Sequence, residues 1–249
     1  MDSLRQRLKS ALSNSPQSFY ARALLEDSRT EIVGDLESAL ILNKAIDLGV
    51  IHGPRLVEGT IEALDEGVEI LASAPLPGLP SGWEWGRGVF MALEDRAALH
   101  AWQEKASASV VQLDETKLAL APAPLRPLLE EALQRGYATC ALAESQPVSF
   151  ASAYLHTETH FDISIDTLEP YRNRGFARMA AAGLIGSEPL KGLSPHWGAL
   201  ESNPASWRTG QSLGFRPAGH LWLACNHVQD SQENRLNEGA KPTAPHELI

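Results

Sequence analysis

Hydrophobic and polar positions follow different patterns in the two halves of the chain. Up to about residue 105, apolar residues recur mainly at steps of three and four, the period of an amphipathic helix. Val57, Ile61, Leu64, Val68 and Leu71 are the clearest example. We therefore expect a mostly helical N-terminal region, with helices over 3–13, 16–26, 36–48, 57–73 and 95–105.

Two parts of this region depart from the helical pattern. Residues 74–82 are rich in proline and glycine, which predicts a linker or a long loop. The segment that follows, 83–93, is expected to be extended. Trp83, Trp85 and Trp102 are interpreted as buried anchors in a core or a domain interface, with an acceptor pocket as the second interpretation.

From residue 106 onward the pattern becomes that of strands with helices between them. Residues 106–120 predict one or two strands, and 124–136 predict a helix that stops at Gly136. Residues 138–143 and 148–155 are separated by a hairpin signal, and a third strand ends at Leu168. We expect these three strands to form an antiparallel meander. A last strand is expected over 215–225, followed by a flexible polar tail over 229–249.

The segment after Leu168 carries the most informative chemistry. A turn leads into a basic and glycine-containing stretch, and a helix begins near Ala177. Free N–H groups of a first helical turn, together with the helix dipole, favour an anion. Gly175 allows the backbone to approach that anion with no Cβ in the way. Strand, loop and helix together predict a phosphate-binding site.

This stretch resembles the acetyl-CoA signature of the GNAT superfamily of N-acetyltransferases, Gln/Arg-x-x-Gly-x-Gly/Ala. The matching residues are Arg172, Gly175 and Ala177. A second segment, in the right order and at the right spacing, matches the family's helix after the next strand through Asn203, Ser206 and Leu213-Gly214-Phe215. The resemblance covers roughly residues 138–226.

The resemblance implies an α/β fold with a GNAT-like mixed, mainly antiparallel sheet flanked by helices. It also implies acetyl-CoA as the co-substrate and transfer of its acetyl group to an amine of unknown identity, a small molecule or a peptide. The strand before the loop would bind the pantetheine arm, and the loop would bind the pyrophosphate. The implied cofactor-binding residues are Ile165, Asp166, Thr167, Arg172, Asn173, Arg174, Gly175, Phe176, Ala177, Arg178, Asn203 and Ser206.

The chain departs from the family at its catalytic positions. Many relatives carry a tyrosine seven residues after the asparagine, as a general acid, and some carry a glutamate five residues before it, as a general base. Gly210 and Gly198 occupy these positions here. The catalytic residues are therefore unassigned, and His156, Glu158, His160 and Glu201 remain candidates for the base. Along the strand, Asp162, Ser164 and Asp166 are expected on one face, with Ile163 and Ile165 on the other.

Composition adds constraints on partners and location. The net charge of -10 argues against nucleic acid, which needs a basic face, and no apolar run is long enough to span a membrane. The first residues do not resemble a secretory signal. Cys140 and Cys225 lie in apolar contexts, which is typical of reduced core residues in a cytoplasmic protein. No metal-ligand spacing is present.

We therefore expect three parts. The first is a mostly helical region, 1–105, which acts on the acceptor side or in assembly, for example of a homodimer. The second is a GNAT-like acetyl-CoA-binding domain, 106–228, and the third is the tail. The predicted reaction is direct transfer without an acyl-enzyme. The first alternative is a catalytically silent CoA-binding or regulatory module with the same fold. The second is an aminoacyl-transfer enzyme that uses another activated donor.

Overall fold

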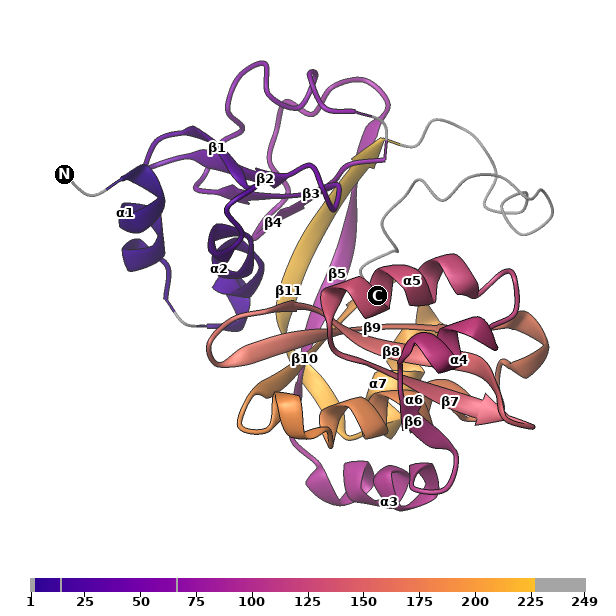
Figure 1. Ribbon diagram of the computed structural model, residues 1–249. Coiled ribbons are helices and arrows are strands. Elements are labelled where there is room, and N and C mark those ends of the chain that lie inside the picture. The colour runs from indigo at the N-terminus through magenta and orange to yellow at the C-terminus, as the bar shows by residue number, and fades with distance from the viewer. Residues whose placement is uncertain (1–2, 14, 66, 227–249) are drawn as a thin grey trace. The chain divides into compact units, whose positions relative to one another are not determined.

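A computed structural model describes residues 3–13, 15–65 and 67–226, so the predicted tail lies outside the described residues. Figure 1 follows the elements along the chain. The helices are α1 (Leu4–Ala11), α2 (Phe19–Glu26), α3 (Arg96–Ala106), α4 (Glu115–Ala119), α5 (Arg126–Arg135), α6 (Phe176–Ile185) and α7 (Pro204–Ser212). The strands are β1 (Glu31–Gly34), β2 (Ala39–Asn43), β3 (Leu48–His52), β4 (Glu69–Ala72), β5 (Trp83–Leu93), β6 (Val110–Gln112), β7 (Ala138–Ala143), β8 (Gln146–His156), β9 (His160–Thr167), β10 (Ser194–Leu200) and β11 (Phe215–Asn226).

The described residues form two compact units. Unit 1 contains residues up to 90 together with 200–202 and 219–226, and unit 2 contains 91–199 and 203–218. The long strands β5 and β11 therefore contribute residues to both. Whether 1–105 and 106–228 behave as separate domains stays a prediction.

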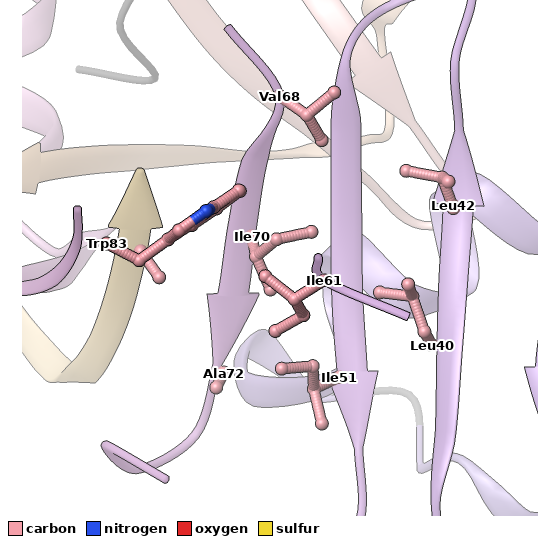
Figure 2. Close-up of a cluster of buried hydrophobic side chains, with 9 residues drawn as sticks. Leu40, Leu42, Ile51, Ile61, Val68, Ile70, Ala72 and Trp83 are labelled. Atoms are coloured by element: carbon pink, nitrogen blue, oxygen red, sulfur yellow. The ribbon is translucent and has the colours of Figure 1, made fainter. Parts of the chain in front are cut away.

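Unit 1 is built on strands, so the prediction of a mostly helical N-terminal region was wrong. Its strand order is β1-β2-β3-β4-β11-β5, with only β3 and β4 parallel among the pairs of known direction. Two short helices, α1 and α2, precede the strands, and α2 packs against β2 and β3. A cluster of aliphatic side chains and Trp83 forms a core of this unit (Figure 2).

The segment 36–48 was predicted as a helix and contains β2 instead. All five residues of β2 are buried, and Leu40 and Leu42 point into the cluster of Figure 2. Because side chains alternate along a strand, Ile41 faces the opposite way and is buried there. A strand buried on both faces has no polar alternation, so its apolar run cannot be told from a buried helix by spacing.

The segment 57–73 was also predicted as a helix. It forms turns followed by β4, and Gly59 and Gly67 have φ angles of 72° and 91°, which a right-handed helix does not contain. Ile61 and Val68 are buried in the same cluster as Ile70 of β4. The helical spacing came from a loop that folds back over the sheet.

Unit 2 contains the predicted three-stranded antiparallel meander, β7-β8-β9. Its strand order is β11-β5-β10-β9-β8-β7-β6, and β9 pairs with β10 in parallel. The mixed, mainly antiparallel sheet is therefore confirmed. Helix α5 ends at Gly136 as predicted, whereas 106–120 contains one strand, β6, and then α4, which Asp114 caps by accepting from the Lys117 N–H.

Helices cover both faces of the sheet in unit 2. Thr139 Oγ1 donates to the Ala180 carbonyl of α6, while Cys140 packs in a cluster with Leu125 and Leu129 of the α5 segment. Consecutive strand residues point to opposite faces, so α6 and α5 lie on opposite sides. Cys140 is buried, as predicted for a core residue, whereas Cys225 is only partly buried.

Candidate functional site

The parallel strands β9 and β10 are paired only at their beginnings. The recorded pairs are Ser194↔His160, Pro195↔Phe161 and His196↔Asp162, although β9 continues to Thr167 and β10 to Leu200. On its other side, β9 remains paired with β8 as far as Thr167. Within the described residues, β9 therefore has an edge open towards β10 beyond Asp162.

Backbone groups of alternate residues point to this open edge. The Leu168 N–H donates to the Val148 carbonyl of β8 at 2.9 Å. Because the backbone groups of alternate strand residues point to opposite edges, the N–H and C=O groups of Ile163, Ile165 and Thr167 point away from β8. Thr167 is already engaged, because its N–H donates to Asp166 Oδ1 and its carbonyl accepts from Arg172 Nε at 3.2 Å. The Asp162↔His196 pair directs the Ile163 N–H to the His196 carbonyl. The Ile163 carbonyl and both main-chain groups of Ile165 are therefore left for an extended ligand.

The predicted phosphate loop follows β9 and ends in a helix N-terminus. Arg172, Asn173 and Arg174 are exposed, and Gly175 is the N-cap of α6 with φ 90°. The first helical hydrogen bond runs from the Met179 N–H to the Gly175 carbonyl, so the N–H groups of 176–178 precede the ladder. No side chain caps this first turn. The loop therefore presents the uncapped N–H groups that an anion needs.

Gly175 also packs against Trp102, a contact that the sequence did not predict. A Cβ on this residue would lie 3.3 Å from Cζ3 of Trp102, on α3. Of the interpretations offered for Trp102, the structure supports a packing anchor within unit 2, and its indole N–H donates to the Ser212 carbonyl at 3.2 Å.

Asn203 and Ser206, also predicted to bind cofactor, have partners within the protein. Asn203 caps α7, and its Oδ1 accepts from the Ser206 N–H at 3.0 Å. Ser206 Oγ is buried and accepts from Trp197 Nε1 at 3.0 Å. A ligand could therefore accept a hydrogen bond from the side-chain NH2 group of Asn203 or from the hydroxyl of Ser206.

The structure offers no acid or base at the two family positions. Gly198 is buried in β10, and a Cβ on Gly210 would lie 3.1 Å from Cδ1 and Nε1 of Trp197. The side that a residue at 210 would occupy is therefore filled by the Trp197 indole.

The candidate bases lie in different settings. His156 and Glu158 are exposed, and the His156 ring packs edge-on to Tyr137. The His160 ring is 4.6 Å from that of His196, and burial lowers its pKa. Glu201 belongs to unit 1, where it pairs with Arg87 at 3.4 Å.

Two buried titratable residues mark the point at which β9 and β10 diverge. Asp162 and His196 are the last recorded pair, and their side chains are 3% and 4% exposed. Burial raises the pKa of Asp162 to about 7, although the Leu155 N–H donates to its Oδ1 at 2.6 Å and Arg135 is nearby. Burial lowers the pKa of His196 to about 4. In the sequence, the burial of His196 is indicated only by its position as a polar residue within the apolar segment 195–200.

The fold and the loop together define an α/β protein with an uncapped helix N-terminus at the end of β9, which diverges from the parallel strand β10. The family model described as GNAT acetyltransferase matches residues 129–221 of this chain. The match begins in α5 and ends in β11, and it contains every predicted cofactor-binding residue.

Solved structures show the same fold at low sequence identity. A GCN5-related N-acetyltransferase-like protein from Streptococcus suis is 20% identical with a TM-score of 0.67, covering 89% of this chain and 97% of its own. A functionally unknown conserved protein from Staphylococcus epidermidis is 12% identical with a TM-score of 0.55, covering 80% and 94%. A putative GNAT-family acetyltransferase from Novosphingobium aromaticivorans is 17% identical with a TM-score of 0.50, covering 78% and 91%. A search of the curated proteins found no match.

Two searches of the described residues were negative. None of their helices has the length and apolar character needed to cross a bilayer. No group of three or more histidine, cysteine, aspartate or glutamate side chains in this part of the chain is arranged to hold a metal ion.

Proposed function

We propose that the protein is an N-acetyltransferase that passes the acetyl group of acetyl-CoA directly to an amine. The main support is an open strand edge at Ile165 combined with the uncapped first turn of α6. The edge suits the amide groups of a pantetheine arm, and the helix N-terminus suits a pyrophosphate. From Asp162 to Thr167 the strand spans about 17 Å, which is the scale of an extended arm rather than of a single small anion.

The proposed reaction needs a neutral amine and a donor for the charge that develops on the thioester oxygen. The amine nitrogen bonds to the carbonyl carbon, the carbon–sulfur bond breaks, and the coenzyme leaves as a thiolate. The thiolate then takes up the proton that the amine nitrogen loses. We assign the backbone N–H group of Ile165 to the oxygen. A thiol with a pKa of about 8.5 leaves as the thiolate without an acid. Glycine at 198 and 210 is therefore compatible with transfer.

Direct transfer is supported by the state of Cys140. Its side chain is fully buried, and burial raises the pKa of the thiol to about 12. A thiol is a nucleophile only as the thiolate, which this environment suppresses at neutral pH. Cys225 lies in unit 1.

A catalytically silent CoA-binding module is the second candidate. It is favoured by the two glycines at the family's acid and base positions, and by the Trp197 indole packed against Gly210. Both candidates require CoA to bind at the loop, and only the first requires turnover.

Calorimetric titration with CoA tests the site through Ala177→Glu. A carboxylate in the first turn of α6 repels phosphate but suits the helix dipole, so CoA affinity should fall at least about tenfold while the fold is kept. Replacing Gly175 is less informative, because a Cβ there also meets Trp102. Ala97→Glu, at the exposed second position of α3, is the matched control. Equal CoA affinity in the two variants would place the cofactor elsewhere.

Thiol release from acetyl-CoA then separates the two candidates. With a panel of small amines and lysine-containing peptides, an N-acetyltransferase should release CoA thiol only when its acceptor is present. CoA binding without release for every amine of the panel would favour the silent module.

A further inference from the structure

Two cations of unit 2 are stacked on one tryptophan beside the phosphate loop. Lys105 Nζ lies 4.3 Å from the centroid of the Trp102 ring, and the Arg178 guanidinium carbon lies 4.7 Å from it. Lys105 comes from α3, one turn beyond Trp102, and Arg178 comes from the first turn of α6. Residues from two helices thus bring two positive charges to one indole.

The indole is fixed in place on two sides. Its N–H donates to the Ser212 carbonyl at the end of α7, and its ring lies against Gly175, the N-cap of α6. An aromatic ring held in this way limits the rotamers of the cations stacked on it. Lys105 and Arg178 are therefore pre-organised next to the helix N-terminus, and less side-chain entropy is lost when they bind a ligand.

Neither cation has a carboxylate partner among the described residues. Some other cations of the described residues form ion pairs, for example Lys9 with Glu26, Lys44 with Glu31 and Lys191 with Glu188. Arg172 and Arg174 of the loop likewise have no recorded ion pair within the described part. In a chain with a net charge of -10, four cations without acids around one helix end are a concentrated positive site.

We propose that Lys105 and Arg178 bind the ribose 3′-phosphate of CoA, and that the protein thereby distinguishes CoA from 3′-dephospho-CoA. This inference rests on the proposed function. CoA carries two separated anionic groups, and the N–H groups of 176–178 with the loop arginines account for the pyrophosphate. A phosphomonoester carries a charge of about -1.5 to -2 at pH 7, which two cations neutralise. The arginine supplies a planar fork of donors and the lysine a point charge.

A purely structural role for the cluster predicts something different. If Lys105 only held α3 against α6, its removal would lower thermal stability and weaken every CoA-like ligand alike. If it binds the 3′-phosphate, its removal affects only the ligand that carries this group.

The test compares calorimetric dissociation constants for CoA and 3′-dephospho-CoA. The wild type should bind CoA more tightly, and Lys105→Gln should weaken CoA about fivefold while leaving 3′-dephospho-CoA unchanged. Lys105→Arg should keep most of the preference. Lys117→Gln, at a partly exposed position of α4, is the control for loss of one positive charge and should change neither ligand. Thermal unfolding of Lys105→Gln should match the wild type, because the side chain is exposed.

Two results would overturn the proposal in distinguishable ways. Equal wild-type affinity for both ligands, or an equal loss for both in Lys105→Gln, removes the 3′-phosphate site and leaves the proposed function intact. If the wild type binds neither ligand, the proposed function fails together with this inference.

Discussion

Asp162 and His196 are adjacent in the sheet but respond to pH in opposite senses. The folded pKa of Asp162, about 7, exceeds its ordinary value of 3.8, so between these limits the folded state binds more protons than the unfolded state. Stability from this group therefore falls as pH rises from 4 to 7. The folded pKa of His196, about 4, is below its ordinary 6.5, so its contribution rises with pH from 4 to 6.5. In the wild type the two slopes oppose each other.

Single substitutions should separate the contributions of Asp162 and His196 to the pH dependence of stability. Asp162→Asn, whose amide oxygen still accepts from the Leu155 N–H, should become more stable relative to wild type as pH rises, by up to about 3 kcal/mol. His196→Gln should show the opposite trend over the same range. Urea unfolding between pH 4.5 and 7.5 measures both. Parallel profiles for the two variants and the wild type would contradict the assignment.

Gly210 is constrained by packing and not only by its place in the family pattern. Gly210→Tyr introduces the family's usual residue, but its Cβ would meet Trp197 at 3.1 Å. We expect a loss of about 1–3 kcal/mol in the free energy of unfolding from overpacking, with no gain in turnover. The neighbouring exposed residue gives a control, Gln211→Tyr, which should be nearly neutral. Faster thiol release in Gly210→Tyr would instead show that a tyrosine at 210 reaches the reacting group.

At the scale of elements, the connection between β9 and α6 depends on one arginine. Arg172 Nε donates to the Thr167 carbonyl, so this side chain ties the loop to the end of the strand. Arg172→Gln should free the loop, raise amide exchange over 169–175 and weaken CoA about tenfold. Calorimetry and hydrogen exchange measure the two effects. Weaker CoA binding with unchanged exchange would show that Arg172 contacts the ligand and does not position the loop.

Elements of the second half were predictable because their signals are local. Hairpin residues, a glycine stop after α5 and the Asn203-Pro204 cap each specify a boundary within a few residues. The strands of unit 1 were not predictable in this way. Both β2 and β4 are short and buried by distant segments, so their burial depends on tertiary packing that periodicity does not report.

The position of the candidate phosphate loop could be predicted from the sequence. Residues 172–178 lead into α6 as expected, because glycine, arginine and a helix start have sequence signatures. The contacts of Trp102 with Gly175 and Ser212 join positions 73 and 110 residues apart, and nothing local in the sequence encodes them. The depth at which Asp162 and His196 are buried was hidden for the same reason.

At the scale of the whole molecule, the boundary near residue 105 can be tested by truncation. A chain that begins at Ser107 lacks α3, and with it Trp102 and the backbone of Asp95, whose N–H donates to the Gly214 carbonyl at 3.0 Å. We expect this chain to lose cooperative unfolding and CoA binding. Circular dichroism and calorimetry against the full chain measure both. A sharp transition with full-length affinity would instead support a modular domain that starts at 106.

The sharing of β11 between the two units has a consequence for how the protein is made. Residues 219–226 of this strand complete unit 1, and three of them pair with β4 between Ile70 and Ala72. The ribosome must add residues 91–218 before it reaches them, which takes about 6 to 26 s at typical rates of synthesis. Throughout that interval, the edge of β4 that later pairs with β11 has no strand beside it. We therefore expect the nascent chain to be more prone to aggregation than the finished protein.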